Sequence, residues 1–161
     1  VEHMVHSSLS EIDIIKNPYA KLIDISCGAG NFLIRVFEEL KLRFHEHLAE
    51  ILLHHPELTG QLKEDNIGRF IVEHNIWGID IDAEAVALLK QALEQAAGCC
   101  CHSNIYCEDS LLAENERIVN GQFDLVIGNP PYLGHKAVTA AYKAFIYQRF
   151  GDVYRDKADI S

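Results

Sequence analysis

The sequence predicts an α/β protein with a doubly wound, mainly parallel sheet. Short apolar runs of strand type alternate with longer stretches whose apolar residues recur at helical spacing. Glycines or polar residues follow directly after these short runs. The 161 residues, 48% of them hydrophobic and 24% charged, are enough for one domain with its own core. Because ligands bind beyond the carboxyl ends of the strands in such sheets, the residues after each strand are the candidates for function.

The first half of the chain is expected to hold a lead-in, one strand and two helices. Residues 1–20 have mixed polarity, and Asn17-Pro18 marks a break before the first strand at 21–25. Apolar residues at helical spacing predict a long helix over 32–54, which His55-Pro56 ends. A short helix is expected over 61–75.

The second half continues the alternation. Asp82 is a plausible N-cap for the helix that follows it, and it precedes a stretch rich in Ala, Leu, Glu and Lys. The remaining expected elements are strands over 76–80, 103–107 and 123–127 and helices over 83–97 and 137–150.

Charge and cysteine content limit the partners and the compartment. The net charge is −10 and no dense Lys/Arg cluster occurs. If the substrate is a nucleic acid, the surface that binds it is therefore expected to lie in another part of a longer protein. Five cysteines, three of them adjacent at 99–101, fit reduced thiols in the cytoplasm. No membrane span or signal peptide is expected. Adjacent cysteines are poor tetrahedral ligands, so we expect no metal site.

Two glycines open the long helix. Gly28 and Gly30 follow the first strand, where glycine lets the backbone approach a ligand closely. No third glycine follows at dinucleotide spacing and no Gly-Lys-Ser/Thr ending occurs, which disfavours a pyrophosphate-bearing cofactor. A tight strand–helix turn would explain the same two glycines.

Acidic residues follow the second and third strands. Asp80 ends the second strand, where a carboxylate can accept hydrogen bonds from both hydroxyls of a ribose. Asp109, with Ser110 and Leu111 behind it, could hold the amine and one face of an adenine ring. Its alternative is an Asx-type loop cap.

The fourth strand leads into Asn129-Pro130-Pro131-Tyr132. The amide of Asn129 offers a donor and an acceptor, the two prolines stiffen the loop, and the ring of Tyr132 is a platform for stacking. A planar substrate with an exocyclic amine would suit this loop, although a proline-rich turn with a capping Asn is the simpler interpretation.

Four ordered segments together resemble S-adenosylmethionine-dependent adenine-N6 DNA methyltransferases of the restriction–modification type. Leu22 to Leu33, with Asp-Ile-Ser-Cys-Gly-Ala-Gly-Asn-Phe-Leu at its centre, is similar to the first motif of that family. Residues 77–82 and 107–111 resemble the second and third motifs, and Asn-Pro-Pro-Tyr the catalytic fourth. The stretch 145–160 is similar to the region that follows in the restriction–modification branch.

The resemblance implies a Rossmann-like class I methyltransferase fold and a direct methyl transfer to the N6 amine of a flipped adenine. S-adenosylmethionine is the implied cofactor and DNA the implied substrate. The implied catalytic residues are Asn129, Pro130, Pro131 and Tyr132. The implied cofactor-binding residues are Asp24, Cys27, Gly28, Gly30, Asp80, Ile81, Asp109 and Ser110.

The sequence also departs from that family. A Tyr-Thr-Pro type motif is not found between Val1 and Pro18, and further strands and a target-recognition domain are expected elsewhere. We therefore expect 21–161 to be an incomplete catalytic domain, whose parent acts with DNA and with a restriction or specificity subunit. A protein-glutamine N5- or rRNA amino-methyltransferase, or a fragment that turns over nothing, are the alternatives.

Overall fold

The computed structural model describes residues 2–101, 103–112 and 115–128, together with Thr139, Tyr142, Ala144, Phe145, Tyr147 and Gln148. A first compact unit ends at Gly128, and the fold is that of this unit. Within this described part of the chain, no helix combines the length and the apolar character that crossing a membrane requires.

A parallel sheet organises the first unit. Its strands in the described residues are β1 (Leu22–Asp24), β2 (Ile76–Asp80), β3 (Asn104–Cys107) and β4 (Leu125–Val126). They lie in the order β3-β2-β1-β4, and every neighbouring pair is parallel. The chain thus moves outward from β1 to β3 and then returns to the other side of β1. The predicted α/β fold with a parallel, doubly wound sheet is confirmed.

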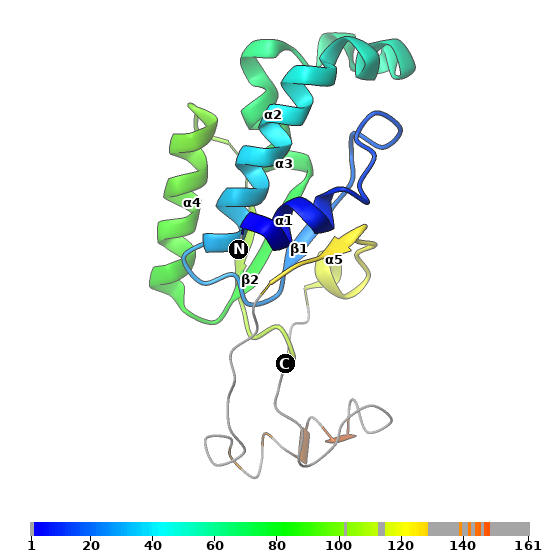
Figure 1. The fold of residues 1–161 in the computed structure, drawn as a ribbon. Coiled ribbons are helices and arrows are strands. Elements are labelled where there is room, and N and C mark those ends of the chain that lie inside the picture. Colours follow the sequence, from blue (N-terminus) through cyan, green and yellow to red (C-terminus); the bar gives the residue numbers. More distant parts are fainter. Residues whose placement is uncertain are drawn as a thin grey trace. The chain divides into compact units, whose positions relative to one another are not determined.

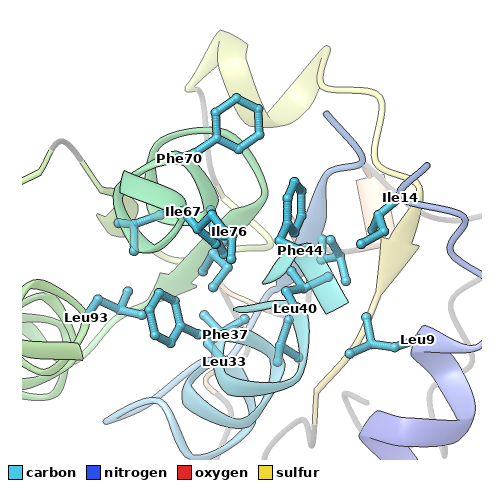
Figure 2. Close-up of a cluster of buried hydrophobic side chains, with 14 of the residues drawn as sticks. Leu9, Ile14, Leu33, Phe37, Leu40, Phe44, Ile67, Phe70, Ile76 and Leu93 are labelled. Atoms are coloured by element: carbon cyan, nitrogen blue, oxygen red, sulfur yellow. The ribbon is translucent and has the colours of Figure 1, made fainter. Parts of the chain in front are cut away.

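Helices cover one face of this sheet. They are α1 (Glu2–Leu9), α2 (Asn31–His54), α3 (Ile67–His74) and α4 (Ala83–Ala97), with α2 to α4 grouped together in Figure 1. Since side chains alternate along a strand, Leu22 of β1, Ile76 of β2 and Ile105 of β3 point into the same apolar cluster as these helices. Figure 2 shows Phe37 and Leu33 of α2 beside Ile76 in this cluster.

The other face carries a smaller apolar cluster. Ile23 of β1 with Trp77 and Ile79 of β2 form it, and Ile118 of α5 (Glu116–Val119) and Phe123 pack against it. The connection from β3 to β4 therefore covers the face opposite to α2 and α4. This reversal is what a change of winding direction requires, because βαβ crossovers are right-handed.

Helix α4 begins and ends as its sequence predicts. The carboxylate of Asp82 accepts the N–H groups of Glu84 and Ala85, at 2.9 and 3.2 Å, which confirms the predicted N-cap. Gly98 ends the helix in the left-handed conformation, with φ of 73°. The buried residues Val86, Leu89 and Leu93 form one face of α4, which holds the helix against the sheet.

The structure contains two helices that the sequence did not indicate, and a third helix starts later than expected. Helix α1 lies in the segment expected to be a lead-in, where Val5 and Leu9 pack into the main core. The helix expected over 61–75 starts only at Ile67. The side chain of Asn66 accepts the N–H of Lys63 and donates to the carbonyl of Gln61, and the chain forms short 3-10 helices at Pro56–Gly60 and Glu64–Asn66 instead. Helix α5 was not anticipated, since four residues are too few for a periodic pattern.

The other strands and helices lie within one or two residues of their predicted bounds, β4 being shorter than the expected strand over 123–127. The expected closing helix over 137–150 falls largely outside the described residues.

Candidate functional site

The turns after β1, β2 and β3 meet at the carboxyl edge of the sheet. The N–H of Gly28 donates to Oδ2 of Asp80 at 2.7 Å, and the N–H of Cys27 donates to the carbonyl of Ile79 at 2.9 Å. The N–H of Glu108 donates to the carbonyl of Asp80 at 3.0 Å. Asp80 is thus the residue through which the three turns are joined, and the convergence predicted from the sequence is present.

The two glycines of the first turn differ in what surrounds them. Gly28 has φ of 50° and no atom within 4 Å of the position that a Cβ would take. Gly30 has φ of 92° and its Cβ position is already filled by the side chain of Leu89 on α4. Gly28 therefore leaves open space in which a ligand can approach the backbone, whereas Gly30 is required by the packing of two helices.

Cys27 turns its side chain toward the protein interior. It is 5% exposed, it belongs to the main apolar cluster, and its Sγ lies 3.1 Å from the Cβ position of Gly78. Burial raises the pKa of this thiol to about 12, so it is neutral at physiological pH. Its side chain fills space beneath the turn, and its backbone N–H donates to the carbonyl of Ile79.

Asp80 and Ile81 lie at the end of β2. Both carboxylate oxygens of Asp80 accept backbone N–H groups, one from Gly28 and the other from Asp82 at 2.9 Å. Each oxygen keeps a second lone pair for another donor. The side chain of Ile81, directly after it, is 72% exposed. Asp80, which can accept further hydrogen bonds, therefore lies next to the exposed apolar side chain of Ile81.

Asp109 and Ser110 follow β3. Oδ1 of Asp109 accepts the N–H of Leu111 at 2.9 Å, which is the Asx-type cap considered from the sequence. Asp109 and Ser110 are both half-buried. The loop cap and a contact with a ligand use different oxygen lone pairs, so the two roles are compatible.

Asp24 is the most deeply buried acid of this edge. It is 2% exposed, and its Oδ1 accepts the N–H of Ser26 at 2.9 Å. Burial, with a smaller contribution from the charge of Asp80, raises the pKa of this carboxyl to about 6. None of the ion pairs within the described part of the chain involves Asp24.

Asp24 also touches the residue where β4 leads out of the sheet. The Cβ position of Gly128 lies 2.9 Å from Cγ of Asp24 and closer still to its Oδ1. These two residues stand between β1 and β4, where the strand order changes direction and doubly wound sheets bind ligands. Gly128 was not singled out from the sequence, although its place directly before Asn129 is a usable signal. Asn129, Pro130, Pro131 and Tyr132 themselves lie outside the described residues.

A hollow of about 670 Å³ lies at the opposite, amino edge of the sheet. Lys21, Trp77, Asn104 and Arg117 are among the residues that line it. The ammonium of Lys21 stands 5.4 Å from the ring centroid of Trp77, so part of this lining is already engaged in a cation–π contact. Among the predicted binding and catalytic residues that the structure describes, none lines this hollow, and the carboxyl edge remains the candidate site.

Comparison with known proteins finds a matching family model and a curated relative. Residues 99–161, which include Asn-Pro-Pro-Tyr, match the family model described as Eco57I restriction-modification methylase. The resemblance to restriction–modification methylases is confirmed. DNA methyltransferase A of Bacillus subtilis (strain 168) is 25% identical to this chain over 152 residues, which cover 85% of this chain and 17% of that protein.

Two solved structures of restriction–modification proteins share the fold. The type IIL restriction-modification enzyme MmeI, solved in complex with DNA, matches with a TM-score of 0.56 at 17% identity, over 98% of this chain and 24% of that one. A modification subunit ascribed to a type I restriction enzyme of Vibrio vulnificus YJ016 matches with a TM-score of 0.50 at 19% identity, over 83% and 23%. This chain therefore spans about a quarter or less of the length of these relatives.

Proposed function

We propose that this chain forms the cofactor-binding and methyl-transfer part of an adenine-N6 DNA methyltransferase of the restriction–modification type. The observation that carries the proposal is the hydrogen bond from Gly28 to Asp80, which unites the glycine turn and the acid of β2 at the edge from which Asn-Pro-Pro-Tyr continues. We assign residues 21–161 to the catalytic domain and leave target recognition to other regions of the protein.

The residues at this edge fit S-adenosylmethionine. Asp80 has acceptor capacity for the two ribose hydroxyls, and the exposed side chain of Ile81 can cover one face of an adenine. Asp109 and Ser110 would accept from and donate to the adenine edge. Gly28 leaves room for the cofactor against the backbone, while Cys27 and Gly30 shape the turn from behind.

Asp24 suits the methionine end of the cofactor. The carboxylate of Asp24 is buried, and it accepts a hydrogen bond from the N–H of Ser26. A cation that reaches such a carboxylate stabilises its charged form, and the α-ammonium group of the cofactor is such a cation. Binding would thus lower the pKa of Asp24 again. The cofactor, when bound, supplies an electrophilic methyl group on its sulfonium.

The Asn-Pro-Pro-Tyr loop, residues 129–132, would hold the target base. The side-chain oxygen of Asn129 and the carbonyl of Pro130 would accept hydrogen bonds from the adenine amine and leave the nitrogen lone pair free. Tyr132 would stack on the flipped base, and Pro131 would keep the loop stiff. Positioning and preorganised dipoles, without a covalent enzyme intermediate, would supply the acceleration.

DNA is the proposed substrate, held largely by regions beyond this chain. A net charge of −10 is unsuited to gripping phosphates, so we place the basic surface, and any contact with a restriction or specificity subunit, elsewhere in the protein. Support comes from the family match over 99–161 and from the fold shared with MmeI, which was solved with DNA. The reduced cysteines favour action in the cytoplasm.

Methyl transfer to competing acceptors tests this proposal. The full-length protein that carries this chain would be incubated with S-adenosylmethionine labelled in its methyl group, together with unmethylated DNA, rRNA and a glutamine-containing peptide. We expect label in DNA alone. Label in the peptide or in rRNA, with DNA unmodified, would assign the loop to glutamine or to RNA amines instead.

A further inference from the structure

Gly128 lies directly on the carboxyl group of Asp24. A Cβ at position 128 would stand 2.9 Å from Cγ of Asp24, 3.3 Å from Oδ2 and closer to Oδ1. Gly128 is not among the glycines with positive φ, so its backbone conformation is open to any residue. The position requires glycine because of the space that Asp24 occupies.

Both partners of this contact are fixed from the sheet. The N–H of Ile127 donates to the carbonyl of Ile23 at 2.9 Å, which sets the end of β4 against the end of β1. Ile127 is buried, at 6% exposure. The carboxyl of Asp24 is held from the other side by the N–H of Ser26, at 2.9 Å. Asp24 therefore forms a rigid support under Gly128.

The same carboxyl group lies beside the proposed cofactor position. It is 2% exposed, and the glycine turn and Asp80 are its neighbours at the edge of the sheet. A ligand cation that pairs with this carboxylate therefore binds the same group on which Gly128 packs. Gly128 in turn is the last residue before Asn129.

We propose that Asp24 is a positioning residue for the Asn-Pro-Pro-Tyr loop: its carboxyl group packs under Gly128 and couples cofactor binding to the point from which Asn129 continues. The inference rests on the proposed function and adds to it a physical link between the cofactor edge and the loop. Asp24 acts here through Gly128 and does not touch the target base.

A double-mutant cycle in the full-length protein tests the coupling. Gly128→Ala, Asp24→Ala and the double variant would be compared with the wild type in single-turnover methylation at saturating cofactor and DNA, and in calorimetric binding of S-adenosylmethionine. We expect Gly128→Ala to lower the rate by about 30-fold and to weaken cofactor binding by about 10-fold. In the Asp24→Ala background, the same step should cost less than about 3-fold in either quantity, because the group that the new methyl meets is gone.

Two further variants separate positioning from general damage. Gly98→Ala introduces a methyl group at a φ of 73° with no atom within 4 Å, so it costs stability far from the site and should leave rate and affinity within about twofold. Asp24→Asn keeps the shape of the support without its charge. Asp24→Asn should therefore retain a higher methylation rate at saturating cofactor than Asp24→Ala. If Gly128→Ala does not fold, this comparison of the two Asp24 variants tests the positioning role of Asp24.

The outcomes distinguish this inference from the function on which it rests. Additive losses in the cycle, or equal rates for Asp24→Asn and Asp24→Ala, in a wild type that methylates adenine would overturn the positioning role alone. A wild type that binds the cofactor without methylating DNA overturns the proposed function, and the affinity cycle still decides the coupling. A wild type that binds no cofactor overturns both.

Discussion

Replacing Asp24 by Asn should change how the stability of the chain depends on pH. The carboxyl is 2% exposed, and burial raises its pKa from 3.8 to about 6. Because the folded-state pKa lies above the unfolded one, the folded chain binds more protons than the unfolded chain between these values. The burial of Asp24 therefore lowers the free energy of unfolding as the pH rises through this range, and the full cost is present above the folded pKa.

The size of the effect follows from the two pKa values. A difference from 3.8 to about 6 corresponds to about 3 kcal/mol in full. Between about pH 4.5 and about pH 8, close to 2 kcal/mol of this develops, since the unfolded chain is already partly ionised at the lower pH. Asn cannot ionise, and it keeps an acceptor for the N–H of Ser26. Relative to the wild type, Asp24→Asn should thus gain about 2 kcal/mol over this interval.

Urea unfolding of the 161-residue chain at several pH values measures this gain. The comparison uses the change with pH, so any constant cost of the new amide group cancels. Asp65→Asn removes the same charge from an exposed position and serves as the control for the loss of a charge alone. If the free energy of unfolding changes with pH equally in the wild type and in Asp24→Asn, the conclusion that burial raises the pKa of Asp24 is refuted.

Three further predictions concern the proposed cofactor and loop. Asp80→Ala should weaken binding of S-adenosylmethionine by about 10-fold or more, whereas Asn129→Ala should spare binding and remove turnover; equal loss of binding in calorimetry would contradict this division. Gly30→Ala should lower the free energy of unfolding by about 2 kcal/mol or more through its clash with Leu89, while Gly28→Ala should cost less stability and more cofactor affinity, as denaturation and calorimetry can compare. Cofactor affinity should fall as the pH falls through about 6, where Asp24 becomes protonated, and a pH-independent affinity would argue against its contact with the ammonium group.

The sequence predicted the sheet well because its signals are local. The strand ending at Asp80 and the helix capped by Asp82 have the bounds that apolar runs and capping chemistry indicate. Helix α1 was missed because Val5 and Leu9 are too few apolar residues to make a pattern, and their burial depends on α2, far along the chain. Tertiary packing, not local preference, decides such a segment.

Site residues were predicted from their position after the strands, and the structure shows which contacts each of them makes. The convergence of Gly28 and Asp80 follows from the topology of a parallel sheet, which the alternation of elements indicates. That Cys27 and Gly30 serve packing does not follow from their spacing, since their partners Gly78 and Leu89 come from other elements. The contact between Asp24 and Gly128 joins residues about a hundred positions apart, and only the register of β1 with β4 reveals it.

The central claim is that the Asn-Pro-Pro-Tyr loop and the Gly28–Asp80 edge together methylate adenine in DNA. Mass spectrometry of nucleosides tests it most directly, on unmethylated DNA treated with the full-length protein and S-adenosylmethionine carrying a deuterated methyl group. The account predicts deuterated N6-methyladenine, absent when Asn129→Ala replaces the wild type. Deuterium in methylcytosine, or DNA without label beside an intact and cofactor-bound protein, would contradict it.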